Sequence, residues 1–144
     1  MKWKEINLED DEIRITKSKV KSGRMVVIGE NLVEWLKICD HSKPIYPSNF
    51  KRRMSGIRVA AGFKSGLKLS KKQKLADAKR KSWVKDYARH TAISCHLRIT
   101  EDYGKTATWA GNSKDVIKES YDGLVPRRIA DEFWAIFPDR SSAH

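Results

Sequence analysis

The residues with the clearest chemical potential in this 144-residue sequence are its cations. Residues 64–85 hold nine Lys or Arg side chains and one acid, Asp77, so the segment carries a net charge of +8. Cations at this density can neutralise the phosphates of a polyanion. A solvated linker would show the same run of charge, and both interpretations stay open at this point. The nine cations are Lys64, Lys68, Lys71, Lys72, Lys74, Lys79, Arg80, Lys81 and Lys85.

The charge of the whole chain points the same way. Thirty Lys and Arg stand against 18 Asp and Glu, which gives a net charge of +12 and a pI of about 9.8. Such an excess indicates a polyanionic partner, most often nucleic acid. No apolar stretch approaches the length of a membrane span, and the N-terminus lacks the apolar run of a secretory signal. The sequence therefore favours a nucleic-acid partner over a membrane.

Metal and disulfide chemistry have little support in the sequence. Only two cysteines occur, Cys39 and Cys95, and they form no Cys-x-x-Cys motif. His90 and His96 are six residues apart, which places them on different sides of a helix. We therefore expect no metal and no cofactor, and the low cysteine content fits a reducing cytoplasm.

The elements that must position these side chains begin with a hairpin. Residues 11–16 alternate polar and apolar side chains, and residues 25–28 are rich in β-branched ones, so both segments are predicted strands. The turn between them carries several cations and Gly23. A helix follows, with Asn31 as its expected N-cap.

A second helix is expected between Ser48 and Gly62. Its predicted apolar face is Phe50, Met54, Ile57 and Ala61, at helical spacing. Its other face is basic and holds Lys51, Arg52, Arg53 and Arg58. Together with the segment at 64–85, this helix is expected to contact nucleic-acid phosphates. The residues predicted to make these contacts are Lys51, Arg52, Arg53, Lys71, Lys72, Lys74, Lys79, Arg80 and Lys81.

The rest of the chain has helical spacing throughout. We predict helices over about 85–99, from 100–102 to Gly111, from Ser113, and from Pro126. The predicted fold class is α+β, mainly α, with a small N-terminal antiparallel sheet packed on helices. The last helix is expected to bury Ile129, Phe133, Trp134 and Ile136.

Several motifs in order resemble the catalytic domain of tyrosine recombinases, the phage integrase family. The segment Tyr87-Ala88-Arg89-His90-Thr91-Ala92 is similar to the Arg-His-Thr box of that family. Residues 110–117 and 120–125 match the two family segments that follow it. Residues 1–6, the hairpin over 11–28 and the helix from Gly29 resemble the family's N-terminal elements. The resemblance covers residues 1 to about 138, as one catalytic domain with a basic insert at about 64–85 and a tail at 139–144.

The resemblance implies a set of catalytic residues and a reaction. In this family a tyrosine hydroxyl attacks a DNA phosphate, the tyrosine becomes linked to the 3′ phosphate, and a 5′ hydroxyl leaves. Tyr121 would be the nucleophile, and Arg89 would bind the phosphate with its planar fork. Lys21, at the hairpin tip, would protonate the leaving oxygen, with Lys17 and Lys19 as alternatives for the same role. His90 would contact other site residues and not the phosphate, or would serve a structural role. No metal or nucleotide takes part.

Two positions depart from the family pattern. Asn112 stands where the family has His or Trp, and its amide can donate a hydrogen bond but cannot shuttle a proton. Asp86 stands where the family has His, and a carboxylate cannot act as a cation at neutral pH. The family's first arginine would precede the residues that match 1–3, so the domain is expected to be N-terminally incomplete. Loss of one transition-state donor costs about 10²–10³ in rate, so we expect weakened activity.

Three functions remain open from the sequence. The first is site-specific cleavage and rejoining of duplex DNA, in a nucleoid-associated protein of a prokaryote or phage. The second is a DNA-binding module that keeps the fold but has lost catalysis, because a tyrosine on an apolar stripe is more often a core residue. The third is a protein that contacts further copies of itself or other recombinase protomers through Pro126–Phe137, anchored by Phe133, Trp134 and Phe137.

Overall fold

A three-stranded antiparallel sheet forms the N-terminal part of the protein. The computed structural model describes residues 1–16, 23–123 and 125–139. After a short 3-10 turn, η1 (Trp3–Glu5), the strands are β1 (Ile6–Asn7), β2 (Glu12–Ile15) and β3 (Arg24–Val27), in the order β1-β2-β3. Ile13 pairs with Val26, which confirms the predicted hairpin. The two-residue β1 was missed because it is too short to show alternation.

The sheet and the first helix share a small core. Helix α1 (Glu30–Lys37) buries Val33 against Ile13 and Ile28. The prediction of Asn31 as N-cap is wrong, since the helix begins one residue after Gly29 and the Asn31 amide oxygen accepts a hydrogen bond from the next backbone N–H at 2.8 Å. Gly29 fits this place because a Cβ there would lie 2.9 Å from the Trp134 ring.

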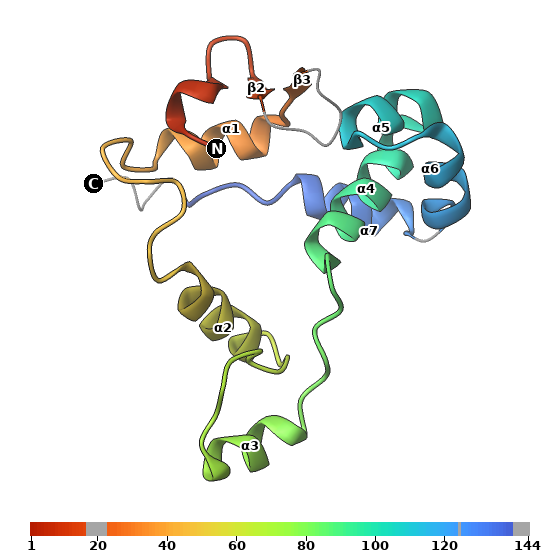
Figure 1. Cartoon of the computed structure of the whole chain (residues 1–144). Helices are drawn as coiled ribbons and strands as arrows, with labels where there is room; N and C mark the ends of the chain where they lie inside the picture. Colours follow the sequence, from red (N-terminus) through yellow and green to blue (C-terminus); the bar gives the residue numbers. More distant parts are fainter. Residues whose placement is uncertain (17–22, 124, 140–144) are drawn as a thin grey trace. The chain divides into compact units, whose positions relative to one another are not determined.

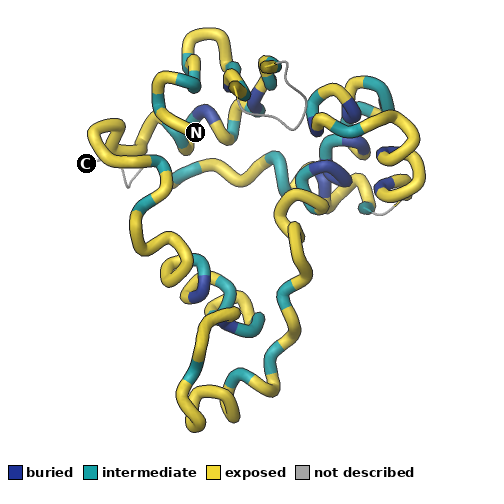
Figure 2. The backbone as a smooth tube through the Cα atoms, viewed as in Figure 1, coloured by how far each residue is buried: buried dark blue, intermediate teal, exposed yellow. Residues whose placement is uncertain are grey.

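Four helices form the C-terminal part of the protein, as predicted, and three of them make the second core (Figure 1). They are α4 (Tyr87–Thr100), α5 (Tyr103–Ala110), α6 (Lys114–Tyr121) and α7 (Arg127–Trp134). Asp102 and Ser113 accept backbone N–H groups as the N-caps of α5 and α6, and Pro126 is the N-cap of α7. The buried core residues come from α4, α5 and α6, as Figure 2 shows, and are Ile93, Leu97, Ala107, Ala110, Ile117 and Tyr121.

An aromatic layer connects the helices with the sheet. The His96 ring lies flat on Trp109 at 4.4 Å between centroids, and Trp134 meets Trp109 edge-on at 6.3 Å. The Trp109 indole N–H donates to the Val27 carbonyl in β3 at 3.0 Å. His96 and both tryptophans are therefore packing residues, and the C-terminal helix packs on its own chain.

The predicted buried stripe of α7 is partly wrong. Ala130 is fully buried and Phe133 and Trp134 are half-buried, but Ile129 and Ile136 are 36% and 55% exposed. The helix turns the small Ala130 toward the core because Trp134, one turn further on, fills the adjoining space against His96 and Trp109.

The chain divides into two compact units. Unit 1 consists of Met1–Ile45 and Ala88–His144, and unit 2 is the inserted segment Tyr46–Tyr87. Unit 2 contains α2 (Phe50–Ala60) and α3 (Lys71–Ala78), the latter beginning at a Ser70 capping box. No helix in the described ranges is both long and apolar enough to cross a membrane.

The predicted apolar face of α2 is wrong in part. Phe50 and Ile57 are 41% and 60% exposed, and the buried residue of the helix is Ser55. The reason is Arg58, whose guanidinium lies over the Trp83 ring at 4.8 Å from its centroid. This cation–π contact turns the Arg58 side of the helix inward.

Candidate functional site

Arg89 and Asn112, two residues of the predicted catalytic set, lie together. Arg89 is exposed on the first turn of α4, and its Nη2 donates to the Ala110 carbonyl at 2.7 Å and to the Asn112 amide oxygen at 3.2 Å. The two residues are 23 positions apart in the sequence and meet because α5 ends beside the start of α4. Since Asn112 accepts from Arg89, its amide nitrogen can still donate to a ligand.

His90 brings the same helix turn to Tyr121. The two rings stack at 5.3 Å between centroids with an interplanar angle of 28°. Tyr121 is the last residue of α6 and is 5% exposed, so it is also a member of the helical core. Its hydroxyl has no hydrogen-bond partner among the residues that the structure describes.

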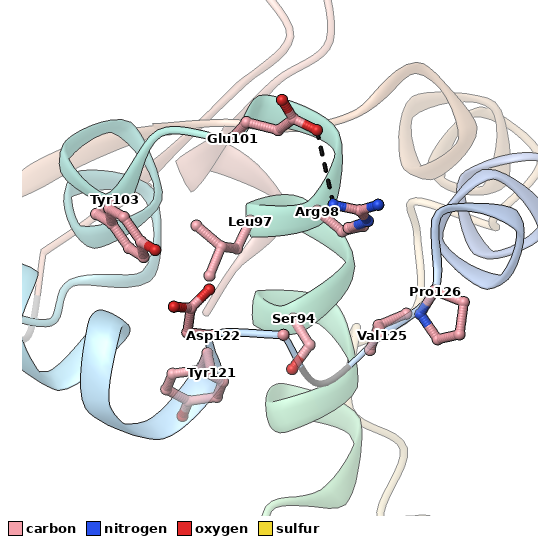
Figure 3. Close-up of a pocket in the computed structure, with 10 residues that line it drawn as sticks. Ser94, Leu97, Arg98, Glu101, Tyr103, Tyr121, Asp122, Val125 and Pro126 are labelled. Atoms are coloured by element: carbon pink, nitrogen blue, oxygen red, sulfur yellow. Dashed lines mark ion pairs between the residues drawn. The ribbon is translucent and has the colours of Figure 1, made fainter.

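A pocket of about 680 Å³ lies on the other side of Tyr121 (Figure 3). One wall is the second half of α4, where Arg98 pairs with Glu101 at 3.7 Å. A hydrogen bond from the Tyr103 hydroxyl to the Asp122 carboxylate raises the pKa of Tyr103. The remaining lining residues are Ser94, Leu97, Gly123, Val125 and Pro126.

Two predicted catalytic residues are not among the described residues of unit 1. Asp86 is exposed in unit 2 and has left-handed backbone geometry, with φ at 57°. Lys21 lies outside the described residues. The described part of the site therefore consists of Arg89, Asn112, His90 and Tyr121.

The residues predicted to bind DNA all belong to unit 2. Eight of the nine are exposed, and the ninth, Arg80, is half-buried and paired with Asp77 at 3.4 Å. Unit 2 holds thirteen Lys and Arg against two acids, a net charge of +11, which leaves +1 for the rest of the chain. The basic character of the protein is therefore a property of this one unit. The eight exposed residues of the predicted DNA-binding set are Lys51, Arg52, Arg53, Lys71, Lys72, Lys74, Lys79 and Lys81.

Sequence reasoning missed Arg24. Its Nη1 donates to the Thr108 carbonyl at 2.7 Å and to the Trp109 carbonyl at 3.1 Å, at the C-terminal end of α5. A Cβ on Gly111 would lie only 2.5 Å from the guanidinium carbon of Arg24. The sequence offered one indication, since Arg24 directly precedes a predicted strand that is rich in β-branched residues. Arg24 was assigned to the turn before that strand instead.

No metal centre accompanies these residues. Within residues 1–16, 23–123 and 125–139, no three His, Cys, Asp or Glu side chains come together in a way that could hold an ion. Comparison with known proteins identifies no relative, since no family model, no curated protein and no solved structure matches the chain.

Proposed function

We propose that the protein binds duplex DNA through unit 2 and cleaves and rejoins it in the manner of a tyrosine recombinase, with Tyr121 as nucleophile. The observation that carries the proposal is the convergence of residues predicted from widely separated motifs. Arg89 bonds Asn112 at 3.2 Å, and its neighbour His90 stacks on Tyr121. An arginine that could bind phosphate thus contacts an amide, and a tyrosine packs on the neighbouring residue of the same helix turn.

The charge distribution supports DNA as the partner. Unit 2 has a net charge of +11 in 42 residues, and unit 1 is almost neutral. Such a basic unit releases counterions when it meets a polyanion, which gives affinity independent of base sequence. Phosphate binding and strand cleavage would therefore be carried out by different parts of the chain.

The reaction at Tyr121 would follow the usual requirements of phosphoryl transfer. The phenolic oxygen bonds to the phosphorus as the bond to the 5′ oxygen breaks, and that oxygen leaves with a proton. Arg89 and the Asn112 amide would stabilise the charge that develops on the non-bridging oxygens. Because Tyr121 is 5% exposed, its ring must leave the His90 stack before attack. Tyr121 ends α6, and Gly123, two residues on, has φ at 66°, so the opening would take place at the end of the helix and not within it.

A second function is favoured by the burial of Tyr121. The ring packs with Ile93 and Ile117, both nearly inaccessible to solvent, as an ordinary core tyrosine would. The alternative is therefore a DNA-binding protein that keeps the arrangement without catalysis. The same Arg89 and unit 2 would hold phosphates, but no covalent step would follow.

Covalent capture separates the two functions. A nicked duplex that loses the strand beyond the cleavage site traps the 3′-phosphotyrosyl intermediate. The first function predicts a protein–DNA band that survives denaturation, disappears in Tyr121→Phe, and persists in the control Tyr103→Phe. A band that survives in Tyr121→Phe, or its absence from the wild-type protein on every duplex tested, would refute Tyr121 as the nucleophile.

Salt dependence tests the role of unit 2. With about four phosphate contacts, the slope of log affinity against log salt is about −3.6, so affinity falls about 10²-fold between 50 and 200 mM salt. Replacing Lys71, Lys72 and Lys74 with Gln should reduce that slope by about 2 to 3, measured by anisotropy of a labelled duplex. The matched control replaces Lys105, Lys114 and Lys118 of unit 1 and should change the slope by less than about 1. An equal effect of both variants would contradict the assignment of binding to unit 2.

A further inference from the structure

We propose that Arg24 is a second guanidinium ligand for the phosphodiester, beside Arg89, at the turn that follows α5. The inference rests on the proposed function, because the ligand is the DNA phosphate that Tyr121 would attack. Arg24 comes from β3 and Arg89 from α4, so two elements of unit 1 supply one guanidinium each. Nothing in the motif resemblance pointed to Arg24.

Both arginines are anchored to the same short stretch of backbone. Arg24 binds the carbonyls of Thr108 and Trp109, and Arg89 binds the next carbonyl, that of Ala110. Each guanidinium therefore has a fixed position before any ligand arrives. Fixed donors are what a charged transition state needs, since they do not have to reorganise during the reaction.

Gly111 shows how closely Arg24 approaches this turn. A Cβ at position 111 would lie 2.5–2.6 Å from three guanidinium atoms of Arg24, too close for any side chain. The residue also has φ at 68°, which L-amino acids other than glycine rarely adopt. Arg89 holds the residues on either side of it, Ala110 and Asn112. The two cations thus lie around a single glycine.

Capping the C-terminal end of α5 does not neutralise the positive charge of the two arginines. The Ala107 carbonyl is already satisfied by the backbone N–H groups of Gly111 and Asn112, at 2.8 and 3.0 Å. The end of a helix carries about half a negative charge, whereas the two guanidiniums carry two positive charges. The turn therefore keeps a net positive charge of more than one unit, which suits an anion.

Each guanidinium keeps unpaired N–H groups. Arg24 uses only Nη1 and Arg89 uses only Nη2 for the contacts described, and within the described ranges the other four nitrogens have no partner. In Arg24 the free Nε–H and Nη2 lie side by side and form a fork, whereas in Arg89 the free Nε–H and Nη1 point in different directions and act as single donors. A phosphodiester has two non-bridging oxygens, and each arginine can bind one of them.

The side-chain Nε–H resonances of the arginines test this inference in the full-length protein. Wild-type protein labelled with ¹⁵N is titrated with thymidylyl-3′,5′-thymidine, a dinucleotide with one phosphodiester. The Arg24 and Arg89 resonances, assigned with Arg24→Lys and Arg89→Lys, should shift with one common dissociation constant. Arg127, paired with Asp131 at 3.1 Å on the exposed side of α7, supplies the control resonance and should not shift.

A variant distinguishes a ligand from a merely structural cap. In Arg24→Lys the charge stays but the fork is lost, so the phosphodiester should bind Arg89 about 10-fold to 100-fold more weakly. A structural cap would leave the dissociation constant at Arg89 unchanged even where the melting temperature falls. The control Arg127→Lys should leave both properties unchanged.

Each outcome decides the inference separately from the proposed function. If Arg89 shifts while Arg24 does not, or if Arg24→Lys leaves the Arg89 affinity unchanged, Arg24 is not a ligand and the inference is overturned. A band in the Tyr121 capture assay would then still support the proposed function. If both resonances shift together and no covalent band forms, the phosphate site stands and the cleavage step falls.

Discussion

Substitution of Gly111 by alanine should destabilise unit 1 for two separable reasons. The backbone there has φ at 68°, and placing alanine in the left-handed region costs about 1–2 kcal/mol. The new Cβ would also displace the Arg24 guanidinium, which donates two hydrogen bonds to carbonyls of α5. Since Arg24 is half-exposed and can bond to water instead, that loss is worth about 1–2 kcal/mol rather than the full value of two charged hydrogen bonds. The expected decrease in the free energy of unfolding is about 2–4 kcal/mol.

Gly123 provides the matched control. Its φ is 66°, but no described atom lies within 4 Å of where its Cβ would be, so Gly123→Ala should cost only the backbone term. Urea unfolding followed by circular dichroism measures both variants, and a third measurement places Gly111→Ala in an Arg24→Ala background. There the cost of Gly111→Ala should fall to that of Gly123→Ala. Equal costs for the two glycine variants in the wild-type background would refute the contact between Arg24 and the turn.

The remaining predictions concern the helical core of unit 1. Ile117 is fully buried, so Ile117→Ala should lower the free energy of unfolding by about 2–5 kcal/mol. The neighbouring Val116 is 42% exposed, so Val116→Ala should lower the same free energy by less than about 1 kcal/mol. Asp102 accepts the Lys105 N–H at 2.9 Å as an N-cap, so Asp102→Ala should cost about 1 kcal/mol in the same urea assay. Burial lowers the pKa of His96 below 6.5, so the unfolded chain takes up its proton first as the pH falls. Thermal stability should therefore decrease as the pH drops below about 6.5, and His96→Gln should flatten that decrease; a pH profile unchanged by the substitution would show that His96 is not its cause.

Sequence patterns predicted the helices well wherever a cap residue and an apolar period coincided. Asp102 and Ser113 were placed at helix starts by their residue type, and both accept the expected backbone N–H groups. The apolar residues after Ser113 favoured one buried side with Val116, Ile117 and Tyr121, of which Ile117 and Tyr121 are buried and Val116 is 42% exposed. Local propensity and packing agree in these helices, so one sequence was enough to find them.

The patterns failed where a long-range contact decides which side of an element is buried. Arg58 was assigned to a basic face, but its cation–π contact with Trp83 turns that face inward and leaves Ile57 exposed. Gly29 replaces Asn31 as the N-cap because the Trp134 ring packs against it from more than a hundred residues away. Periodicity carries no information on such partners.

The candidate site also has residues that sequence patterns predicted and residues that depend on long-range contacts. The motif order predicted that Arg89 and Asn112 belong together, and the structure places them 3.2 Å apart. Arg24 could not be predicted in the same way, since its partners are backbone carbonyls 84 and 85 residues away and carbonyls leave no trace in a sequence. The burial of Tyr121 was likewise open until the core was known.

Identification of the residue that becomes attached to DNA tests the central claim most directly. The covalent complex from a nicked duplex is digested with nuclease and protease, and the nucleotide-bearing peptide is sequenced by mass spectrometry. The account predicts a single modified tyrosine, Tyr121, in the peptide that ends α6. Attachment at Tyr103 or at any other residue, or an unmodified Tyr121 in protein that has cleaved its substrate, would contradict it.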